Sequence, residues 1–446
     1  MTAPSPTASA EEGPISNRRV LKIALPIVLS NATIPILGLV DTGVVGQIGT
    51  AEPIAAVGVG AAMITAIYWV FGFLRMGTVG LVGQALGAND RDEVSLLLTR
   101  ALLIAGAAGI TLILLQIPVI WGALRISPSP SDVEDLAHTY MAIRIWSAPA
   151  AIALYGVTGW LIAQERTRAV LVLQLWMNGL NIVLSLAFVL GLNWGIGGVA
   201  FATFLAEYSG LALGLWLCRD AFRNPVWRAR LRVLDPDKLR HMALVNRDIL
   251  IRSLLLQAIF LSFILLGGHF GATPQAANQI LVQFLYVTAY ALDGFAFAAE
   301  AIVARAMGAK RPVALRRGAL LTSAWGTAIG AALTLTFWIA GPAIIDIMAK
   351  SPEVQQAART YLPWMIAAPL LGVASWMLDG IFIGATRSRD MRNMMVLSAA
   401  IYFAALWPLM ALYGNHGLWI ALLLSFIARG ITLGARYPAL ERAAAG

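Results

Sequence analysis

Long uncharged apolar runs restrict the possible folds of this chain more than any other feature. A helix needs about 20 apolar residues to cross a hydrocarbon core of roughly 30 Å, and the alternating pattern of a membrane β-barrel is absent. Only 12% of the 446 residues are charged, about half the share of a typical soluble domain. We therefore expect an all-α polytopic membrane protein with twelve transmembrane helices. The expected spans are 20–47, 53–85, 95–122, 135–162, 168–191, 195–218, 246–269, 274–305, 315–341, 353–385, 392–413 and 415–437.

The positions of Lys and Arg indicate how these helices are oriented. Basic residues gather before the first run, in 219–247, in 310–317 and in 387–392, whereas the loops on the opposite side hold few. By the positive-inside rule the basic loops face the cytoplasm. We expect a multi-pass protein of a bacterial-type plasma (inner) membrane with both termini cytoplasmic. The formal net charge of +9 is then a topology signal, and no nucleic-acid partner is expected.

Few residues suited to catalysis or metal binding are present. Cys218 is the only cysteine, and the four histidines are scattered over loops and helix ends. The patterns HExxH and GxxxxGK[ST] are absent, and the sequence shows no filter loop of a channel. We therefore expect neither an enzyme nor a channel, and neither a metal site nor a cofactor.

The chain divides at its longest polar stretch, where eight basic residues lie in 219–247. The segment GTVGLVGQALGAND (77–90) resembles AAEAIVARAMGAK (298–310) at a shift of 221 residues, close to half the chain length. We expect two six-helix lobes related by a parallel internal repeat, whose axis lies along the membrane normal. The expected divisions are a disordered cytoplasmic tail at 1–17, an N-terminal lobe at 18–219, a cytoplasmic linker at 220–245 and a C-terminal lobe at 246–446.

Asp41 lies inside the otherwise uncharged run 23–48, where an unpaired charge is costly and needs an explanation. It lies about six residues, or roughly 9 Å, from the outer end of the first helix. Asn181 and Ser185 on the fifth helix and Thr203 on the sixth reach the same depth. These groups predict a cation- or proton-coupling pocket around one carboxylate, with no Lys or Arg at that depth in the same half. For the amide and hydroxyl groups, hydrogen bonding that only joins helices is the alternative.

Further polar and flexible side chains mark a candidate substrate cavity. Asn181 and Ser185 continue a stripe on one face of the fifth helix, and a second stripe follows the eighth helix. Methionines suit a cavity for varied apolar substrates, although they are also common core filler. The cavity candidates are Gln174, Asn178, Met63, Met177, Tyr290 and Asp293.

Prolines and acidic residues elsewhere in the spans carry separate expectations. Pro26 and Pro35 precede Asp41, and each removes a backbone hydrogen bond, so the first helix can bend there. Glu300 is expected to pair at the membrane interface with Arg305 or Lys310. For Asp293 and Asp379 the structural and functional roles are both open, and their possible partners are Arg252 and Arg429.

Four segments together resemble the MATE (multidrug and toxic compound extrusion) transporters, and more narrowly their DinF-like branch. They are PILGLVDTGVVGQIG (35–49), YWVFGFLRMGTVGLVGQALGA (68–88), LDGFAFAAEAIVARAMGA (292–309) and DGIFIGATRSRDMRNMM (379–395). The resemblance implies a V of two six-helix lobes and export by alternating access, driven by inward proton or sodium flow.

The resemblance also implies roles for particular residues. The family's first-helix carboxylate matches Asp41, its bending proline matches Pro26, and its cation-pocket residues match Asn181 and Thr203. Where relatives carry a second acidic residue, this chain has Ser185, which disfavours sodium. We therefore expect a monomeric secondary antiporter that exports lipophilic or cationic drugs or metabolites in exchange for protons through Asp41. The alternatives are a sodium-coupled multidrug exporter and a flippase for lipids or lipid-linked sugars.

Overall fold

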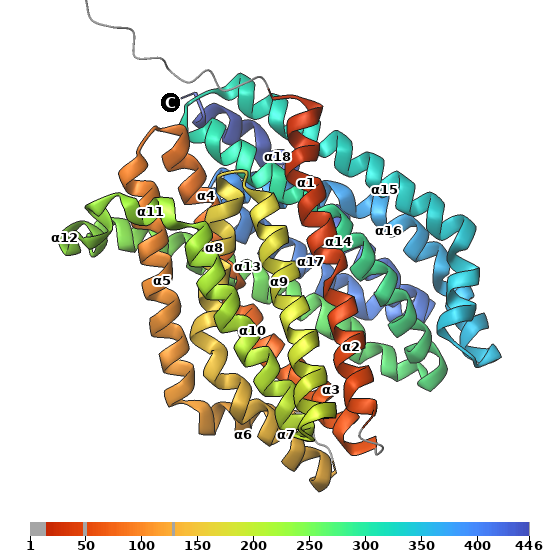
Figure 1. Cartoon of the computed structure of the whole chain (residues 1–446). Coiled ribbons are helices and arrows are strands. Elements are labelled where there is room, and N and C mark those ends of the chain that lie inside the picture. The colour runs from red at the N-terminus through yellow and green to blue at the C-terminus, as the bar shows by residue number, and fades with distance from the viewer. Residues whose placement is uncertain (1–14, 48–50, 127–129, 446) are drawn as a thin grey trace, which may run out of the picture.

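The structure, a computed structural model, describes residues 15–47, 51–126 and 130–445. Every regular element in these ranges is helical (Figure 1). Twelve stretches are long and apolar enough to cross a membrane, so the predicted all-α membrane fold is confirmed. They are Asn17–Gly46, Glu52–Gly87, Arg91–Leu114, Ser131–Ala163, Thr167–Gly191, Gly195–Leu217, Arg230–Phe270, Ala272–Gly308, Pro312–Met348, Pro352–Gly384, Ser388–Tyr413 and Asn415–Ala443.

Several spans consist of more than one helix. The helices of the first half are α1 (Asn17–Ala32), α2 (Ile34–Gly46), α3 (Ala51–Trp69), η1 (Val70–Gly72), α4 (Phe73–Gly87), α5 (Arg91–Leu114), α6 (Gln116–Ile126), α7 (Ser131–Arg144), η2 (Ile145–Ser147), α8 (Ala148–Ala163), α9 (Thr167–Leu186), η3 (Ala187–Gly191) and α10 (Gly195–Leu217). Those of the linker are α11 (Arg219–Arg223), η4 (Pro225–Arg228) and α12 (Arg230–Val233). Those of the second half are α13 (Pro236–Leu266), η5 (Gly267–Phe270), α14 (Ala272–Gly308), α15 (Pro312–Met348), α16 (Pro352–Gly384), α17 (Ser388–Tyr413) and α18 (Asn415–Ala443).

At three places the helices depart from the predicted bounds for a local reason. The third run does not continue to 122: α5 ends at Leu114, because Pro118 cannot donate an amide to the carbonyl of Leu114. Helix α13 begins inside the predicted linker, where Asp235 accepts from two first-turn amides ahead of Pro236. The predicted tail 1–17 lies mostly outside the described residues, and its end is helical because Ser16 caps α1.

The packing places one helix of each half against the other half. One buried apolar cluster lies almost wholly in the first half, and another lies in the second. A third cluster joins Val20, Ile23 and Ala24 of α1 to α14, α15, α16 and α18. Helix α1 lies along α14 in Figure 1, and α13 packs on α4 in the corresponding way. Each half thus contributes one helix that packs on the other half, as two halves related by a parallel repeat would do.

The two halves pack tightly at one end through small residues. A Cβ at Gly83 would lie 2.4 Å from the Ala304 Cβ, and one at Gly87 would lie 2.1 Å from the Arg305 carbonyl oxygen. Gly83 and Gly87 therefore allow the helices of the two halves to approach closely. Gln84 adds hydrogen bonds to the Thr386 hydroxyl, 2.8 Å, and the Gly384 carbonyl, 3.2 Å.

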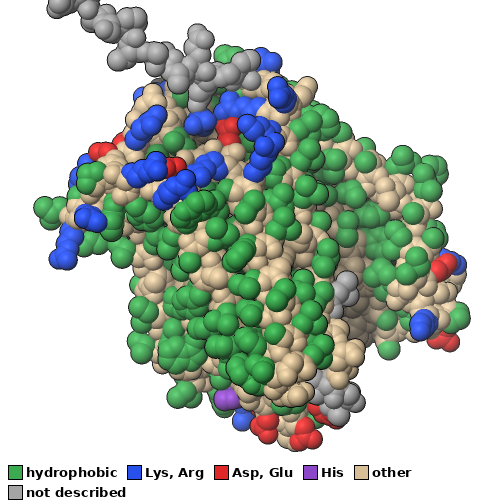
Figure 2. Space-filling model, in the orientation of Figure 1, with side chains coloured by type: hydrophobic (Ala, Val, Ile, Leu, Met, Phe, Trp, Pro, Cys, Tyr) green, Lys and Arg blue, Asp and Glu red, His purple; other side chains and the backbone are tan. Residues whose placement is uncertain are grey.

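Figure 1 shows the helices converging at this end and spreading apart toward the other. Figure 2 shows Lys and Arg side chains gathered at the same end, which we call the basic end. The structure is therefore closed at the basic end.

Candidate functional site

The first span breaks at Thr33, between α1 and α2. Pro35 occupies the second position of α2 and has no backbone amide to donate. The amide of Thr33 donates to the carbonyl oxygen of Ser30. The Thr33 hydroxyl accepts from Asn178 Nδ2 at 2.8 Å. The break thus lies just before Pro35. Asn178, which belongs to the predicted polar stripe of α9, hydrogen-bonds to the residue at the break.

Pro26 behaves differently from Pro35. Helix α1 continues through Pro26, although this proline leaves the carbonyl of Lys22 without its usual partner. The Thr167 hydroxyl at the start of α9 donates to that carbonyl at 3.3 Å. Bending at Pro26 therefore stays a prediction, whereas an interruption is present ahead of Pro35.

The break changes which neighbours the first span contacts. Helix α1 packs on α14 and α9, whereas α2 packs on α3, α9 and α10 of the first half. Asn31, at the end of α1, donates to the Tyr290 carbonyl at 3.3 Å. The first span thus contacts both halves up to the break, and α2 then packs on helices of the first half.

Three of the four predicted coupling residues meet beside α2. Asn181 Nδ2 donates to Thr203 Oγ1 at 2.7 Å, and Ser185 Oγ donates to Asn181 Oδ1 at 3.3 Å. Asn181 is 1% exposed and Ser185 is fully buried. These hydrogen bonds join α9 to α10. The alternative role, in which the polar groups hold helices together, therefore describes at least part of what this cluster does.

Asp41 lies on α2, which packs against both helices of this cluster. Within the described residues the carboxylate makes no hydrogen bond to Asn181, Ser185 or Thr203, and its buried Oδ1 has no hydrogen-bond partner at all. A buried carboxylate oxygen without a donor is costly when the group is charged. The position therefore suits a group that takes up a proton or a cation.

One basic residue does share the surroundings of Asp41, contrary to the sequence-based expectation. Arg144 at the end of α7 lies within electrostatic reach of the Asp41 carboxylate. Its guanidinium donates to both Glu207 carboxylate oxygens, at 2.7 and 2.9 Å, and to Ser147 Oγ at 2.7 Å. Because Glu207 pairs with it, a buried arginine is tolerated in this apolar surrounding.

A cavity of about 380 Å³ opens between the break and this ion pair. Of the predicted cavity residues, Gln174 and Met177 line it, whereas Asn178, Met63, Tyr290 and Asp293 do not. Asn178 lies behind the wall, where it accepts from Gln174 at 2.9 Å. The wall also includes Asn31, Tyr68, Arg75, Arg144, Tyr155, Glu207 and Phe297.

Arg75 closes the cavity toward the basic end and links the two halves. Its guanidinium donates to Glu300 Oε2 at 2.9 Å and Oε1 at 3.3 Å, and lies 3.9 Å from the centre of the Phe297 ring. The predicted ion pair of Glu300 is therefore present, but its partner is Arg75 and not Arg305 or Lys310. Both cationic groups of the cavity, Arg75 and Arg144, are thus neutralised by a glutamate.

Deeper in the second half, Asp379 pairs with both of its expected partners. Arg252 donates to the Asp379 carboxylate, and Arg429 lies 3.7 Å from it. Asp293 makes no hydrogen bond or ion pair within the described part of the chain, so only Asp379 is held in the way the sequence suggested.

The comparison with known protein families identifies this architecture. The MatE family model matches residues 26–187 and again 249–409, which is more than half of the chain. The chain belongs to the MATE family. The two matches are offset by 223 residues at their first positions and by 222 at their last, which agrees with the predicted repeat.

Individual relatives of this MATE-family chain support the assignment. The chain is 38% identical to DNA damage-inducible protein F of Escherichia coli K12, over 94% of this chain and 92% of that protein. It superimposes on the Vibrio cholerae MATE transporter VcmN in the bent form with a TM-score of 0.84 and 20% identity, covering 96% and 97% of the two chains. A MATE structure in the bent conformation gives a TM-score of 0.86 at 17% identity, with the same coverage. The chain is a multi-pass MATE-family transporter, as predicted.

Sequence reasoning missed two features of the MATE-family site. Arg144 is the one Lys or Arg within the predicted span 135–162, and an arginine inside a span is itself a signal of a buried partner. The Arg75–Glu300 pair joins residues 225 positions apart, and only the repeat, which places 77–90 beside 298–310, could have suggested it.

Proposed function

We propose that this MATE-family chain is a proton-coupled antiporter that exports lipophilic or cationic small molecules and is switched by protonation of Asp41. The carrying observation is the buried Oδ1 of Asp41, which has no hydrogen-bond donor within the described residues. A proton on the carboxyl group removes the cost of a charge that the surrounding groups do not stabilise. The basic end then faces the cytoplasm, and the cavity communicates with the external side.

The break at Thr33 supports a route from protonation to movement. Helix α2 carries Asp41 and leans on α9 and α10, whereas α1 packs on α14. A neutral Asp41 interacts differently with the Arg144–Glu207 pair and with the Asn181 cluster. The angle between α1 and α2 can change at Thr33, where Pro35 removes one backbone hydrogen bond. This change would shift α2 against the cavity wall and release the substrate outward.

The cavity charges favour a neutral or cationic cargo. Arg75 and Arg144 are each paired with a glutamate, so neither offers a spare positive charge to a phosphate group. The rings of Tyr68, Tyr155 and Phe297 supply apolar and π surfaces for a lipophilic cation. A lipid or lipid-linked sugar flippase would need unpaired cationic groups here, so the drug or metabolite exporter is preferred.

Sodium coupling is the second candidate, and Ser185 separates it from proton coupling. A sodium ion prefers several oxygen ligands with enough negative charge to offset its lost water shell. The coupling residues offer one carboxylate, Asp41, with the neutral oxygens of Asn181, Ser185 and Thr203. A single carboxylate suffices for a proton.

The test is gradient-driven export of a fluorescent lipophilic cation from proteoliposomes. An imposed proton gradient without sodium should drive export in the parent chain and not in Asp41→Asn, whereas Asp346→Asn, at an exposed surface pair, should behave as the parent. Ser185→Asp asks whether a second carboxylate confers sodium dependence. Export driven only by a sodium gradient at constant pH in the parent chain would overturn the proton assignment.

A further inference from the structure

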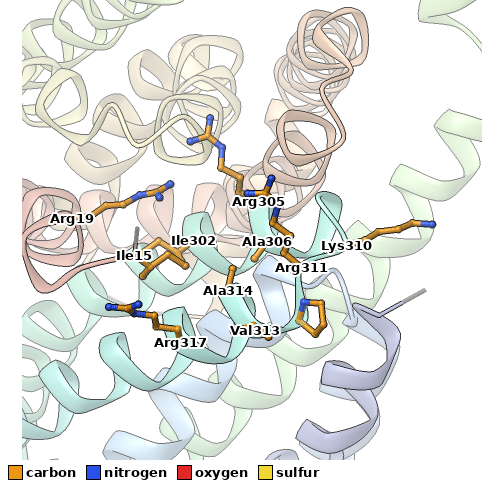
Figure 3. Close-up of a pocket in the computed structure, with 11 residues that line it drawn as sticks. Ile15, Arg19, Ile302, Arg305, Ala306, Lys310, Arg311, Val313, Ala314 and Arg317 are labelled. Carbon is orange, nitrogen blue, oxygen red and sulfur yellow. The ribbon is translucent and has the colours of Figure 1, made fainter. Parts of the chain in front are cut away.

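A second cavity lies at the basic end, away from the transport site. It has a volume of about 520 Å³ and lies between the start of α1, the end of α14 and the start of α15. In Figure 3 the side chains of Ile15, Ile302 and Ala314 lie at its centre, with Arg19, Arg305, Arg311 and Arg317 around them. The cavity thus combines an apolar floor with a cationic rim.

The charged side chains around the cavity all carry positive charge. All charged side chains that line the cavity are basic: Arg19, Arg305, Lys310, Arg311 and Arg317. Arg19 and Arg305 also contact Glu165, which lies outside the lining. Lys310, Arg311 and Arg317 have no side-chain hydrogen bond or ion pair to any described residue, and all three are exposed. A neighbouring larger cavity also contains basic residues, but Glu165 is part of its lining.

The position of the cavity fits a membrane ligand. Helices α14 and α15 are both candidate spans, one ending at Gly308 and the other starting at Pro312, so the cavity lies where the chain leaves the apolar layer. Val313, at this boundary, is 80% exposed although it is apolar. Basic pockets between transmembrane helices on the cytoplasmic side are the sites that bind anionic lipid headgroups.

We propose that this cavity binds the phosphate of an anionic phospholipid from the leaflet at the basic end. The guanidinium groups of Arg311 and Arg317 contact the phosphate oxygens, since guanidinium forms strong charge-assisted hydrogen bonds to phosphate. The acyl chains lie along Ile15, Ile302 and the exposed Val313. The bound lipid joins the start of α1 to α14 and α15 at the closed end of the molecule.

The proposal is tested by lipid binding to the full chain in detergent micelles, followed by native mass spectrometry. Phosphatidylglycerol should bind, whereas zwitterionic phosphatidylcholine should not. Arg311→Gln/Arg317→Gln should weaken phosphatidylglycerol binding by roughly 25-fold, from about one factor of five for each lost charge. Arg317→Gln alone should weaken it by about fivefold and serves if the double variant is poorly folded.

A matched control removes two charges that are also exposed, from the linker region. Arg230→Gln/Arg240→Gln should leave phosphatidylglycerol binding unchanged, and equal loss in both double variants would reduce the effect to general surface charge and overturn the proposal. Inorganic phosphate at millimolar concentration should not displace the lipid, and displacement would assign the cavity to a soluble anion. Asp41→Asn should bind phosphatidylglycerol as the parent does, so this readout is independent of the coupling mechanism.

Discussion

The ion pair between Arg75 and Glu300 gives a prediction about how the two halves are held together. The pair is nearly enclosed, with side-chain exposures of 10% for Arg75 and 2% for Glu300, and it carries two hydrogen bonds. In Glu300→Gln the buried guanidinium loses its counter-charge. Breaking a buried pair in this way costs about 3 to 5 kcal/mol.

Part of that cost is offset, because the Phe297 ring lies 3.9 Å below the Arg75 guanidinium and stabilises a desolvated cation by up to about 2 kcal/mol. We therefore expect Glu300→Gln to lower the free energy of unfolding by about 3 kcal/mol. Arg75→Gln/Glu300→Gln, which buries no charge at this site, should recover about 2 kcal/mol of that loss.

The assay is reversible unfolding by SDS titration in mixed micelles, monitored by circular dichroism. The control is Asp346→Asn, which breaks the exposed Arg359–Asp346 pair, whose side chains are 41% and 42% exposed. An exposed pair contributes at most about 1 kcal/mol. If Glu300→Gln costs no more than Asp346→Asn, or if the double variant is less stable than the single one, the reasoning about a buried pair is refuted.

Three further predictions concern separate parts of the molecule. Gly87→Ala should cost about 1 to 3 kcal/mol by SDS titration, because its Cβ would lie 2.1 Å from Arg305 O, while Gly106→Ala, with no neighbour within 4 Å, should cost nothing; equal effects would contradict the packing at the basic end. Asn178→Leu should cost about 1 kcal/mol through the lost bond to Thr33, and an unchanged unfolding midpoint would show that this bond does not stabilise the break. Burial raises the pKa of the Cys218 thiol to about 12, so maleimide should label the native chain very slowly at pH 7 to 8 and rapidly in SDS; fast native labelling would contradict the burial.

The spans were predictable because each helix satisfies its own backbone in the membrane. Their order and approximate bounds therefore follow from apolar length alone, and the errors fall where a cap or a proline acts locally. Pro118 after α5 and Asp235 before α13 were both readable signals. Hydropathy alone does not register either signal, because a cap or a proline acts on one or two backbone hydrogen bonds.

The candidate site was predictable only in part. The periodicity of α9 correctly placed Asn181 and Ser185 together, since residues four apart share a helical face. Which helix would meet that face could not be derived, and so the bond from Asn178 to Thr33 was not foreseen. Pairs such as Arg144–Glu207 depend on how helices cross, and a sequence shows the charged residues without showing their partners.

The most direct test of the central claim is proton release on substrate binding. Purified protein in a lightly buffered micelle solution is mixed with a lipophilic cation, tetraphenylphosphonium, and a pH-indicator dye reports the protons released. If proton and cargo compete through Asp41, the parent chain should release protons near neutral pH, Asp346→Asn should do the same, and Asp41→Asn should release none while still binding the cation. Undiminished proton release from Asp41→Asn would contradict the account.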